Sequence, residues 1–338
     1  MKAYRIRSGG GLASLRSTDE KPIANLGPHE VRVDMHAVSL NYRDLLVSDG
    51  DYPVSSREPV IPGSDGAGEI IEIGARVTRF RVGDRVASIY FPNWVDGAQT
   101  PANTTATLGA DNNGVLAEQF VANEESLVKI PDHLDYAEAA TLPCAAATAW
   151  NALFVEGNLK PGQTVLLQGT GGVSIHALQL ARAAGARTII TSSSDTKLER
   201  ARKLGADASI NYRSNPEWDV EALRLTGGRG ADLVLEIGGR DTLKRSLSAT
   251  RMGGMIAVIG GLSGWAPELD YFSLISGARH ITGIFVASRR MFEDLNRFVS
   301  HAGIHPVIDR TFEFGQAREA YEYLRSGSHF GKVVVRVR

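Results

Sequence analysis

The feature that constrains the fold most is a glycine-rich turn between a short apolar strand and a helix. Residues 164–168 have the pattern of a buried strand, residues 169–174 form the turn, and an alanine-rich helix is predicted over 175–184. Further strands are predicted at 187–191, 232–235 and 255–259. Strands that alternate with helices at this spacing form a parallel sheet through right-handed crossovers. The sequence therefore predicts an α/β protein with a doubly wound parallel sheet.

The turn matches the pattern by which a strand–helix unit binds the pyrophosphate of a dinucleotide. Gly169 allows the tight turn, and Gly171 lets the backbone approach phosphates at the helix N-terminus. Ser174 replaces the third glycine of the pattern, with a side chain small enough to fit against the sheet. A strand–helix turn that binds nothing is the alternative. The other expected cofactor contacts in the turn are Thr170, Gly172 and Val173.

The residues after the second strand indicate which dinucleotide binds. An acidic residue about 20 positions past the glycines holds the ribose 2′-hydroxyl of NAD, but residues 191–194 are Thr-Ser-Ser-Ser. Ser192, Ser193 and Lys197 offer hydroxyls and a cation, which attract the 2′-phosphate of NADPH. Tyr212, after the third strand, adds a further donor. We therefore predict NADPH; serines that only cap the following helix are the competing interpretation.

The N-terminal part of the chain has a different pattern. Its first 125 residues are mostly predicted as short strands, at 31–38, 69–73 and 85–89. Residues 91–113 form a long polar loop of the kind that often shapes a substrate site. Trp94 in this loop is either a lid residue or an anchor that packs the loop down.

Composition excludes several classes of function. The chain has 338 residues with 37 Lys+Arg and 38 Asp+Glu, so neither nucleic acid nor an anionic membrane is an expected partner. A single cysteine, Cys144, excludes a disulfide scaffold and an all-cysteine metal cluster. The first residues lack the apolar stretch of a secretory signal, and the longest apolar run, 253–262, is too short to span a bilayer. We expect a cytoplasmic protein.

Several segments together resemble the medium-chain dehydrogenase/reductase superfamily over nearly the whole chain, and its zinc-independent, quinone-oxidoreductase-like branch most closely. The resemblance implies a GroES-like, β-rich catalytic domain at 1–125 and 290–338 and a Rossmann NADP-binding domain at 126–289, with the active site between them. It also implies a small-molecule substrate and a homodimer or homotetramer. The segments that carry it are 41–44 (NYRD), 50–53 (GDYP), 62–68 (PGSDGAG), 82–86 (VGDRV), 140–144 (ATLPC), 204–206 (LGA) and 331–334 (GKVV).

Zinc members of that superfamily hold a catalytic metal with a Cys, a His and a further Cys or Glu. The matching positions in this chain are Asn41, Ser64 and Cys144. An amide and a hydroxyl are poor zinc ligands, and a catalytic site needs about three good ones. Residues 90–114 also lack the cysteines of a structural zinc site. We therefore predict that the protein binds no metal, and that Cys144 is a packed side chain.

The resemblance also assigns roles to single residues. Asn41 would orient the nicotinamide ribose or a substrate oxygen, and Tyr52 would donate to the developing oxyanion or form an aromatic wall of the pocket. Thr148 would contact the nicotinamide, unless it is an ordinary core threonine. Lys332 would lie near the cofactor phosphates, with a solvated lysine as the alternative.

Two backbone segments are implied to hold the nicotinamide amide. One follows the strand at 255–259, where ligands of open α/β sheets bind. The other lies at 284–286, which an ordinary strand across a dimer would explain equally well. The residues expected to contact the cofactor are Gly260, Gly261, Leu262, Phe285 and Val286.

The absence of zinc ligands restricts the chemistry. Alcohol oxidation would lack the Lewis acid that lowers the pKa of the hydroxyl. Hydride addition to a quinone, enone or 2-alkenal leaves a delocalised anion that needs only hydrogen-bond donors and a proton. We therefore predict a zinc-independent, NADPH-dependent oxidoreductase acting on such acceptors. The alternatives are an NAD(P)-dependent alcohol dehydrogenase whose carbonyl is polarised by Asn41 or Tyr52, and an NADPH-binding sensor without efficient catalysis.

Overall fold

The structure, a computed structural model, describes residues 1–21, 25–55, 58–266 and 268–338. The chain divides into two compact units: Met1–Ala147 with Ala287–Arg338 (unit 1), and Thr148–Val286 (unit 2). From the sequence the first boundary was expected earlier, after residue 125. The boundary lies later because residues 126–147 add to unit 1, where β7 pairs with β5 and α3 packs on β3 and β4.

Unit 1 is built on a β-sheet that is antiparallel apart from its β14–β15 pair. Its strand order in the described residues is β14-β15-β3-β4-β5-β7, with β6 paired to β3. The long strand β3 lies at its centre, because alternating residues such as Val31, Val33 and Met35 are buried in the core. The strands are β1 (Lys2–Arg5), β2 (Arg16–Asp19), β3 (Glu30–Leu40), β4 (Asp65–Ile73), β5 (Arg85–Ser88), β6 (Gln119–Asn123), β7 (Leu127–Lys129), β14 (Ile308–Glu313) and β15 (Lys332–Arg336).

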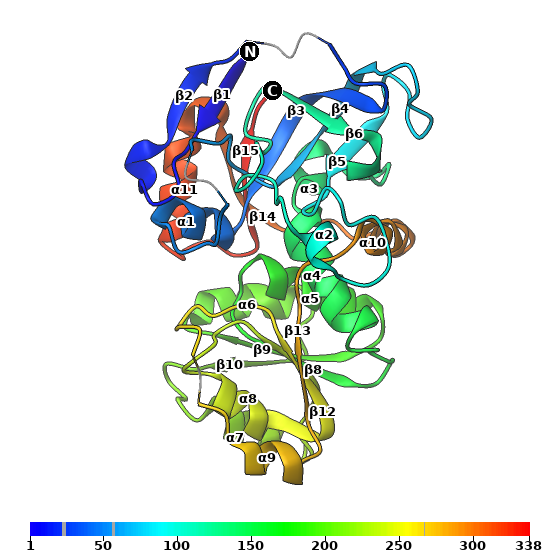
Figure 1. The fold of residues 1–338 in the computed structure, drawn as a ribbon. Coiled ribbons are helices and arrows are strands. Elements are labelled where there is room, and N and C mark those ends of the chain that lie inside the picture. Colours follow the sequence, from blue (N-terminus) through cyan, green and yellow to red (C-terminus); the bar gives the residue numbers. More distant parts are fainter. Residues whose placement is uncertain (22–24, 56–57, 267) are drawn as a thin grey trace. The chain divides into compact units, whose positions relative to one another are not determined.

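The helices of unit 1 bring distant parts of the chain together. Helix α1 packs against α11 near the C-terminus, and the two lie side by side in Figure 1. The polar loop after Phe91 contains α2, and Trp94 is buried, so it packs this loop down. No helix among the described residues is both long and apolar enough to cross a membrane. The helices are α1 (Tyr42–Asp49), α2 (Pro101–Thr104), α3 (Tyr136–Ala139), α10 (Arg289–Ala302) and α11 (Ala317–Arg325), with a π-helical turn at Leu142–Ala146.

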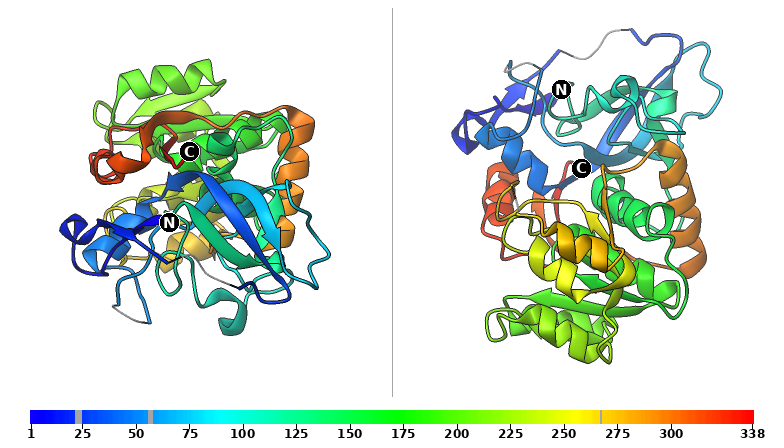
Figure 2. Two further views of the ribbon diagram at one scale, coloured as in Figure 1. Left: turned by 90° about the horizontal axis from the view of Figure 1, so that it is seen from above. Right: turned by 60° about the horizontal axis from the view of Figure 1, so that its bottom comes forward.

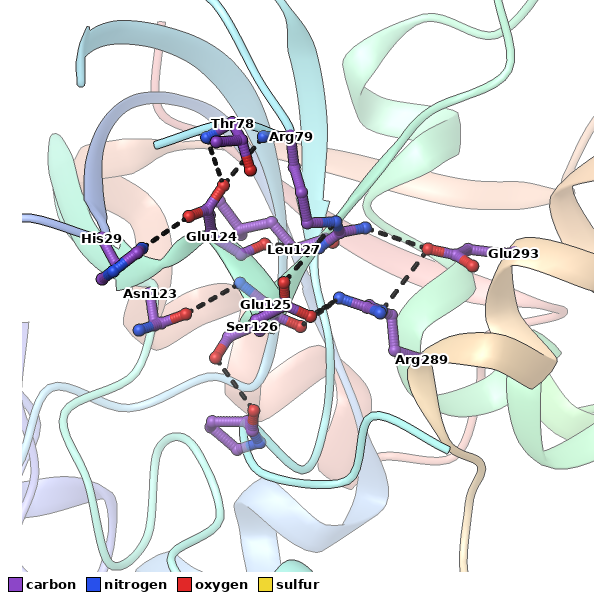
Figure 3. A network of polar contacts seen from close by, with 11 residues as sticks. His29, Thr78, Arg79, Asn123, Glu124, Glu125, Ser126, Leu127, Arg289 and Glu293 are labelled. Atoms are coloured by element: carbon purple, nitrogen blue, oxygen red, sulfur yellow. Dashed lines mark hydrogen bonds and ion pairs between the residues drawn. The ribbon is translucent and has the colours of Figure 1, made fainter. Parts of the chain in front are cut away.

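A polar network anchors α10 to the β-sheet of unit 1 (Figure 3). The buried carboxylate of Glu124 accepts a hydrogen bond from the backbone N–H of Arg79 at 2.8 Å. The guanidinium of Arg79 donates to Glu293 on α10 at 3.0 Å, and Arg289 pairs with Glu125. These contacts fix the start of the segment that returns from unit 2.

Unit 2 is a doubly wound parallel sheet. In its described part the strand order is β10-β9-β8-β11-β12-β13, and every pair is parallel. The order reverses between β8 and β11, which is where open α/β sheets bind ligands. The predicted α/β architecture, with one β-rich domain and one doubly wound parallel sheet, is confirmed. The strands are β8 (Thr164–Leu167), β9 (Arg187–Ser192), β10 (Ala208–Asn211), β11 (Ala231–Glu236), β12 (Thr250–Val258) and β13 (His280–Gly283).

Helices cover both faces of this sheet. Helices α5 and α6 lie on one face and α7, α8 and α9 on the other, as Figures 1 and 2 show from three sides. The core between them is apolar, with Leu166, Ile189 and Val234 fully buried. The helices are α4 (Ala147–Trp150, with Ala147 still in unit 1), α5 (Gly172–Ala183), α6 (Asp195–Lys203), α7 (Trp218–Leu225), α8 (Leu243–Ala249) and α9 (Tyr271–Ser276), with a π-helical turn at Asn151–Val155.

Candidate functional site: a coenzyme edge and a buried polar cluster

The glycine-rich turn of unit 2 has the geometry expected for a dinucleotide. Gly169 follows β8 with a φ of +70°, and Gly171 is the residue before the first turn of α5. A Cβ atom added at either glycine would meet no protein atom within 4 Å, so the turn borders open space. Ser174, which replaces the third glycine, is buried and donates to the Gln168 carbonyl at 2.5 Å. The backbone at the start of α5 can therefore receive a pyrophosphate.

A buried amide–carboxylate pair supports this turn, and the sequence analysis did not find it. Gln168 precedes the turn and donates to Glu236, at the end of the neighbouring strand β11, at 2.8 Å. The Glu236 carboxylate also accepts from the Gly239 N–H, at 2.8 Å, and from the hydroxyls of Thr242 and Ser246. Four donors satisfy this buried carboxylate. It therefore holds the turn after β8 and the loop after β11 in fixed positions relative to each other. The available signal was a polar residue at the end of each of two adjacent apolar strands.

The adenosine end of the expected cofactor site lies after β9 and β10. Ser194 accepts from the Lys197 N–H and caps α6, so the capping interpretation applies to this serine. Ser192 is buried and Ser193 is half-buried. The Tyr212 N–H donates to the Ser192 carbonyl at 3.1 Å, which joins the two loops. Ser192, Ser193, Lys197 and Tyr212 therefore lie on neighbouring segments, as a 2′-phosphate site requires.

The nicotinamide end of the expected cofactor site falls on the segments after β12 and β13. Gly260 and Leu262 donate their N–H groups to carbonyls of the β11 loop, and the Leu262 side chain is exposed. After β13, Phe285 is 43% exposed and Val286 has a φ of +55°. A positive φ is incompatible with a continuing strand, so the segment at 284–286 is not an ordinary strand. Thr148, on α4 of the same unit, is buried.

Unit 1 contains a buried cluster of charged and polar side chains around Lys332. Lys332 is 3% exposed, and its ammonium donates to the Asn41 Oδ1 at 2.5 Å and to the Leu40 carbonyl at 2.7 Å. It is therefore not a solvated lysine. Asn41 is also buried. The Lys332 cation is thus bound to Asn41, the residue at the first zinc-ligand position of the superfamily pattern.

The second and third positions of that pattern are also engaged within the protein. The Ser64 hydroxyl donates to one oxygen of Asp65 at 2.6 Å, and the Cys144 backbone N–H donates to the other at 3.0 Å. Burial raises the pKa of Asp65, which Lys332 and these two donors partly oppose. The pKa of the Cys144 thiol is raised too, first by desolvation and then by the charge of Asp65. Cys144 is therefore a thiol and not a thiolate.

These donors do not fit a zinc ion. At the three ligand positions of the superfamily pattern the chain has an amide, a hydroxyl and a thiol, and of these only the thiol, once deprotonated, is a good zinc ligand. The Lys332 ammonium already binds the amide oxygen and would repel a second cation. Among the described residues, no three His, Cys, Asp or Glu side chains are grouped in a way that could hold a metal.

Tyr52 belongs to a hydroxyl pair in the same unit. The Tyr52 and Tyr90 hydroxyls lie 2.7 Å apart, and the Arg43 guanidinium carbon lies 4.6 Å from the Tyr52 ring centre and 5.1 Å from that of Tyr90. Burial raises the pKa of Tyr90. Either hydroxyl can be the donor of this hydrogen bond; when Tyr90 donates, the hydroxyl of the half-buried Tyr52 side chain is left to donate to a ligand. Tyr90 and Arg43 could not be found from the sequence, since they contact Tyr52 only in the fold.

Asp44 links the cluster to the start of α1. Its carboxylate accepts from the Asn41 N–H at 2.8 Å, as the third residue of a capping box does. Burial raises the pKa of Asp44 to about 6, against the opposing effect of Arg43. Asp44 thus holds the backbone of Asn41, and Lys332 holds its side chain.

Known proteins resemble this chain over almost its entire length. A zinc-binding dehydrogenase family model matches residues 172–301, and an alcohol dehydrogenase GroES-like domain model matches residues 27–132. A zinc-type alcohol dehydrogenase-like protein of Schizosaccharomyces pombe is 44% identical over 97% of this chain and 96% of its own length. The chain belongs to the medium-chain dehydrogenase/reductase superfamily. A quinone oxidoreductase of Pseudomonas aeruginosa is 31% identical, covering 99% of both chains.

Solved structures agree with this membership of the medium-chain dehydrogenase/reductase superfamily. The crystal structure of an NAD-dependent alcohol dehydrogenase is 34% identical and superposes with a TM-score of 0.91 over 100% of both chains. The protein is accordingly an NAD(P)-dependent oxidoreductase of this superfamily. Relatives named after alcohol dehydrogenases and relatives named after quinone reductases both occur, so the names do not select the substrate.

Proposed function

We propose that the protein is a zinc-independent, NADPH-dependent reductase of quinones, enones or 2-alkenals, acting in the cytoplasm. The observation that carries this proposal is the buried Lys332 ammonium on Asn41, at 2.5 Å, where a zinc enzyme has its first ligand. A cation supplied by the chain stabilises the buried carboxylates Asp44 and Asp65 without a metal.

The proposed chemistry needs only donors that unit 1 possesses. NADPH, held at the glycine-rich turn and the loops after β9 and β10, would supply a hydride, that is two electrons and a proton, to the electrophilic carbon of the acceptor. The electron pair of the C=C or quinone system then shifts to oxygen, giving an enolate or a quinol anion. The Tyr52 hydroxyl donates a hydrogen bond to that oxygen, supported by the Tyr90 hydroxyl and the Arg43 charge. A proton from water completes the saturated carbonyl or the hydroquinone, and NADP⁺ is the second product.

The preference for NADPH is supported by the loops after β9 and β10. Ser192, Ser193 and Tyr212 bring hydroxyl groups to neighbouring segments, and Lys197 lies in the first turn of α6. The segment 191–194 has no carboxylate to repel a 2′-phosphate. Charge-assisted contacts to phosphate are among the stronger hydrogen bonds in proteins.

We also propose a homodimer or homotetramer. Helix α9 of unit 2 exposes Tyr271, Phe272 and Ile275, each at least 70% accessible. Contiguous exposed apolar side chains of this kind mark protein–protein contacts. Light scattering after size-exclusion chromatography checks this, and a mass of 36.4 kDa, that of one chain, contradicts it.

Metal analysis combined with turnover tests the main proposal. The purified protein is expected to contain far less than one zinc per chain and to oxidise NADPH with a small panel of quinones and enals. Tyr52→Phe keeps the ring over Arg43 and should lower kcat by roughly tenfold or more, as expected for a lost oxyanion donor. One tightly bound zinc per chain, with oxidation of simple alcohols that chelators abolish, would support the alcohol dehydrogenase alternative instead. Tight NADPH binding without turnover on any acceptor would support a sensor.

A further inference from the structure

Val286 has a strained backbone conformation in unit 2. Its φ is +55°, in the left-handed region that glycine and asparagine tolerate but a β-branched residue does not. Such a residue costs on the order of 1–3 kcal/mol and persists only where the surrounding structure holds it. Val286 is buried, so it has not been left in this conformation by loose packing. A specific contact must therefore hold Val286 in this conformation.

That partner is Asn151. Its side-chain Nδ2 donates to the Val286 carbonyl at 2.8 Å, across 135 residues of sequence. Asn151 is 1% exposed, and its Oδ1 has no hydrogen-bond partner among the described residues. It is the first residue of the π-helical turn at Asn151–Val155, and π turns occur frequently at functional sites. The amide is thus buried to make this one contact.

The contact leaves a specific backbone group available. The last ladder bond of this segment runs from the Ile284 N–H to the Val258 carbonyl, at 2.9 Å. After this bond, the Val286 carbonyl accepts a hydrogen bond from Asn151, whereas the Val286 N–H makes no hydrogen bond within the described part of the chain. The positive φ of Val286 sets the direction of this N–H relative to the carbonyl that Asn151 binds.

We propose that Asn151 is a positioning residue for coenzyme binding: it holds Val286 in the left-handed conformation, so that the Val286 N–H is set to bind the amide oxygen of the nicotinamide. The proposal rests on the proposed function only in taking a nicotinamide coenzyme as the ligand of this segment. Asn151 itself does not touch the coenzyme. Its effect is confined to the nicotinamide half, because the adenosine half is held by the loops after β9 and β10.

The first test compares two ligands in Asn151→Leu. NADPH contains the nicotinamide, whereas adenosine 2′,5′-bisphosphate contains only the adenosine half. The variant is expected to raise the Kd of NADPH by roughly tenfold, as for one lost hydrogen bond, and to leave the Kd of the bisphosphate unchanged. Equal weakening of both ligands, or no weakening of either, would overturn the proposal.

Asn296→Leu is the matched control. Asn296 is also buried, and its Nδ2 donates to the Lys129 carbonyl at 2.9 Å, but it lies in unit 1. Its Oδ1 likewise has no partner among the described residues. The control should lower the free energy of unfolding as Asn151→Leu does, without changing the Kd of NADPH. A parallel loss of NADPH affinity in both variants would show a merely structural role for Asn151.

Two further variants test how Asn151 acts. Asn151→Asp keeps the shape, and its carboxyl can donate to the Val286 carbonyl only when protonated, so the Kd of NADPH should fall toward the wild-type value at acid pH. Val286→Gly adopts a positive φ without help, so the double variant Asn151→Leu/Val286→Gly should bind NADPH more tightly than Asn151→Leu alone. A double variant no better than Asn151→Leu, or an Asn151→Asp profile without this pH dependence, would overturn the proposal.

Failure of the proposed function is distinguishable from failure of this inference. If the wild type binds NADH more tightly than NADPH, the coenzyme preference is wrong. The same comparison is then made with NADH and ADP-ribose, and Asn151→Leu should still weaken only the ligand that carries the nicotinamide.

Discussion

The glycine turn of unit 2 and the polar cluster of unit 1 represent two ways to prepare a site. The turn offers backbone groups beside open space, where a side chain at Gly169 or Gly171 would meet no protein atom. The cluster is packed inward, and the charges of Lys332 and Asp65 are satisfied by the protein itself. The first is built to receive a ligand, and the second to fix the residues around it.

This difference determines which property a substitution changes. Removing a group from the turn alters ligand binding, because the protein does not depend on it for packing. Removing a group from the cluster alters stability, because a buried charge loses its partner. The following experiments test this contrast.

Lys332→Met should have the largest effect. It leaves the Asn41 Oδ1 and the buried carboxylates without their cation, so the free energy of unfolding should fall by about 3–5 kcal/mol. Urea unfolding measures this. Lys129→Met is the control: its ion pair with Asp84, at 2.9 Å, involves a lysine side chain that is 58% exposed, and its loss should cost about 0–1 kcal/mol. Similar midpoints for the two variants would contradict a cation essential to the cluster.

Lys197→Ala tests the expected 2′-phosphate site on the loops after β9 and β10. It should weaken NADPH much more than NADH, by about 1–3 kcal/mol for a lost charge-assisted contact, with little change in stability. Fluorescence titration with both coenzymes gives the ratio. Lys203→Ala, at the other end of α6, should leave the ratio unchanged. Equal weakening of NADPH and NADH by Lys197→Ala would mean that the 2′-phosphate is held elsewhere.

Gly171→Ala separates binding from stability most cleanly. Its φ is −80°, so alanine is accommodated without strain, and its Cβ would meet no protein atom. The free energy of unfolding should change by less than about 0.5 kcal/mol, while the Kd of the coenzyme should rise by roughly tenfold because the Cβ takes the space of the pyrophosphate. Gly315→Ala, equally open, should change neither quantity. A Gly171→Ala variant with wild-type affinity would place the pyrophosphate elsewhere.

The last expected effect is a pH dependence of stability due to Asp44. Its pKa is raised from 3.8 to about 6 in the fold, so the folded state binds this proton more tightly than the unfolded state. The stabilising contribution is present below about pH 4 and is lost as the pH rises through about 6. Between these values the wild type should lose about 2–3 kcal/mol more than Asp44→Asn, which has no proton to release there. Parallel stability–pH curves would show that Arg43 and Lys332 cancel the burial of Asp44.

Much of unit 2 could be predicted from the sequence, for local reasons. The turn at Gly169–Gly172 lies between a strand and a helix that form where periodicity places them, and crossover handedness fixes the rest of the sheet. The Gln168–Glu236 pair could not be predicted, because each residue alone is an unremarkable polar residue at a strand end. Asn151 escaped prediction too, since its partner lies 135 residues away and is recognisable only by a backbone angle.

The sequence by itself determined the two-part α/β architecture, the coenzyme-binding turn and the absence of two zinc-ligand side chains at Asn41 and Ser64. These depend on residue type and on neighbours along the chain. Only the tertiary structure decided that a cation lies on Asn41, because Lys332 reaches it across 291 residues by the pairing of β15 with β3. The register between strands that are distant in the sequence sets such contacts. The partner of a side chain such as Lys332 can therefore be identified only when that register is known.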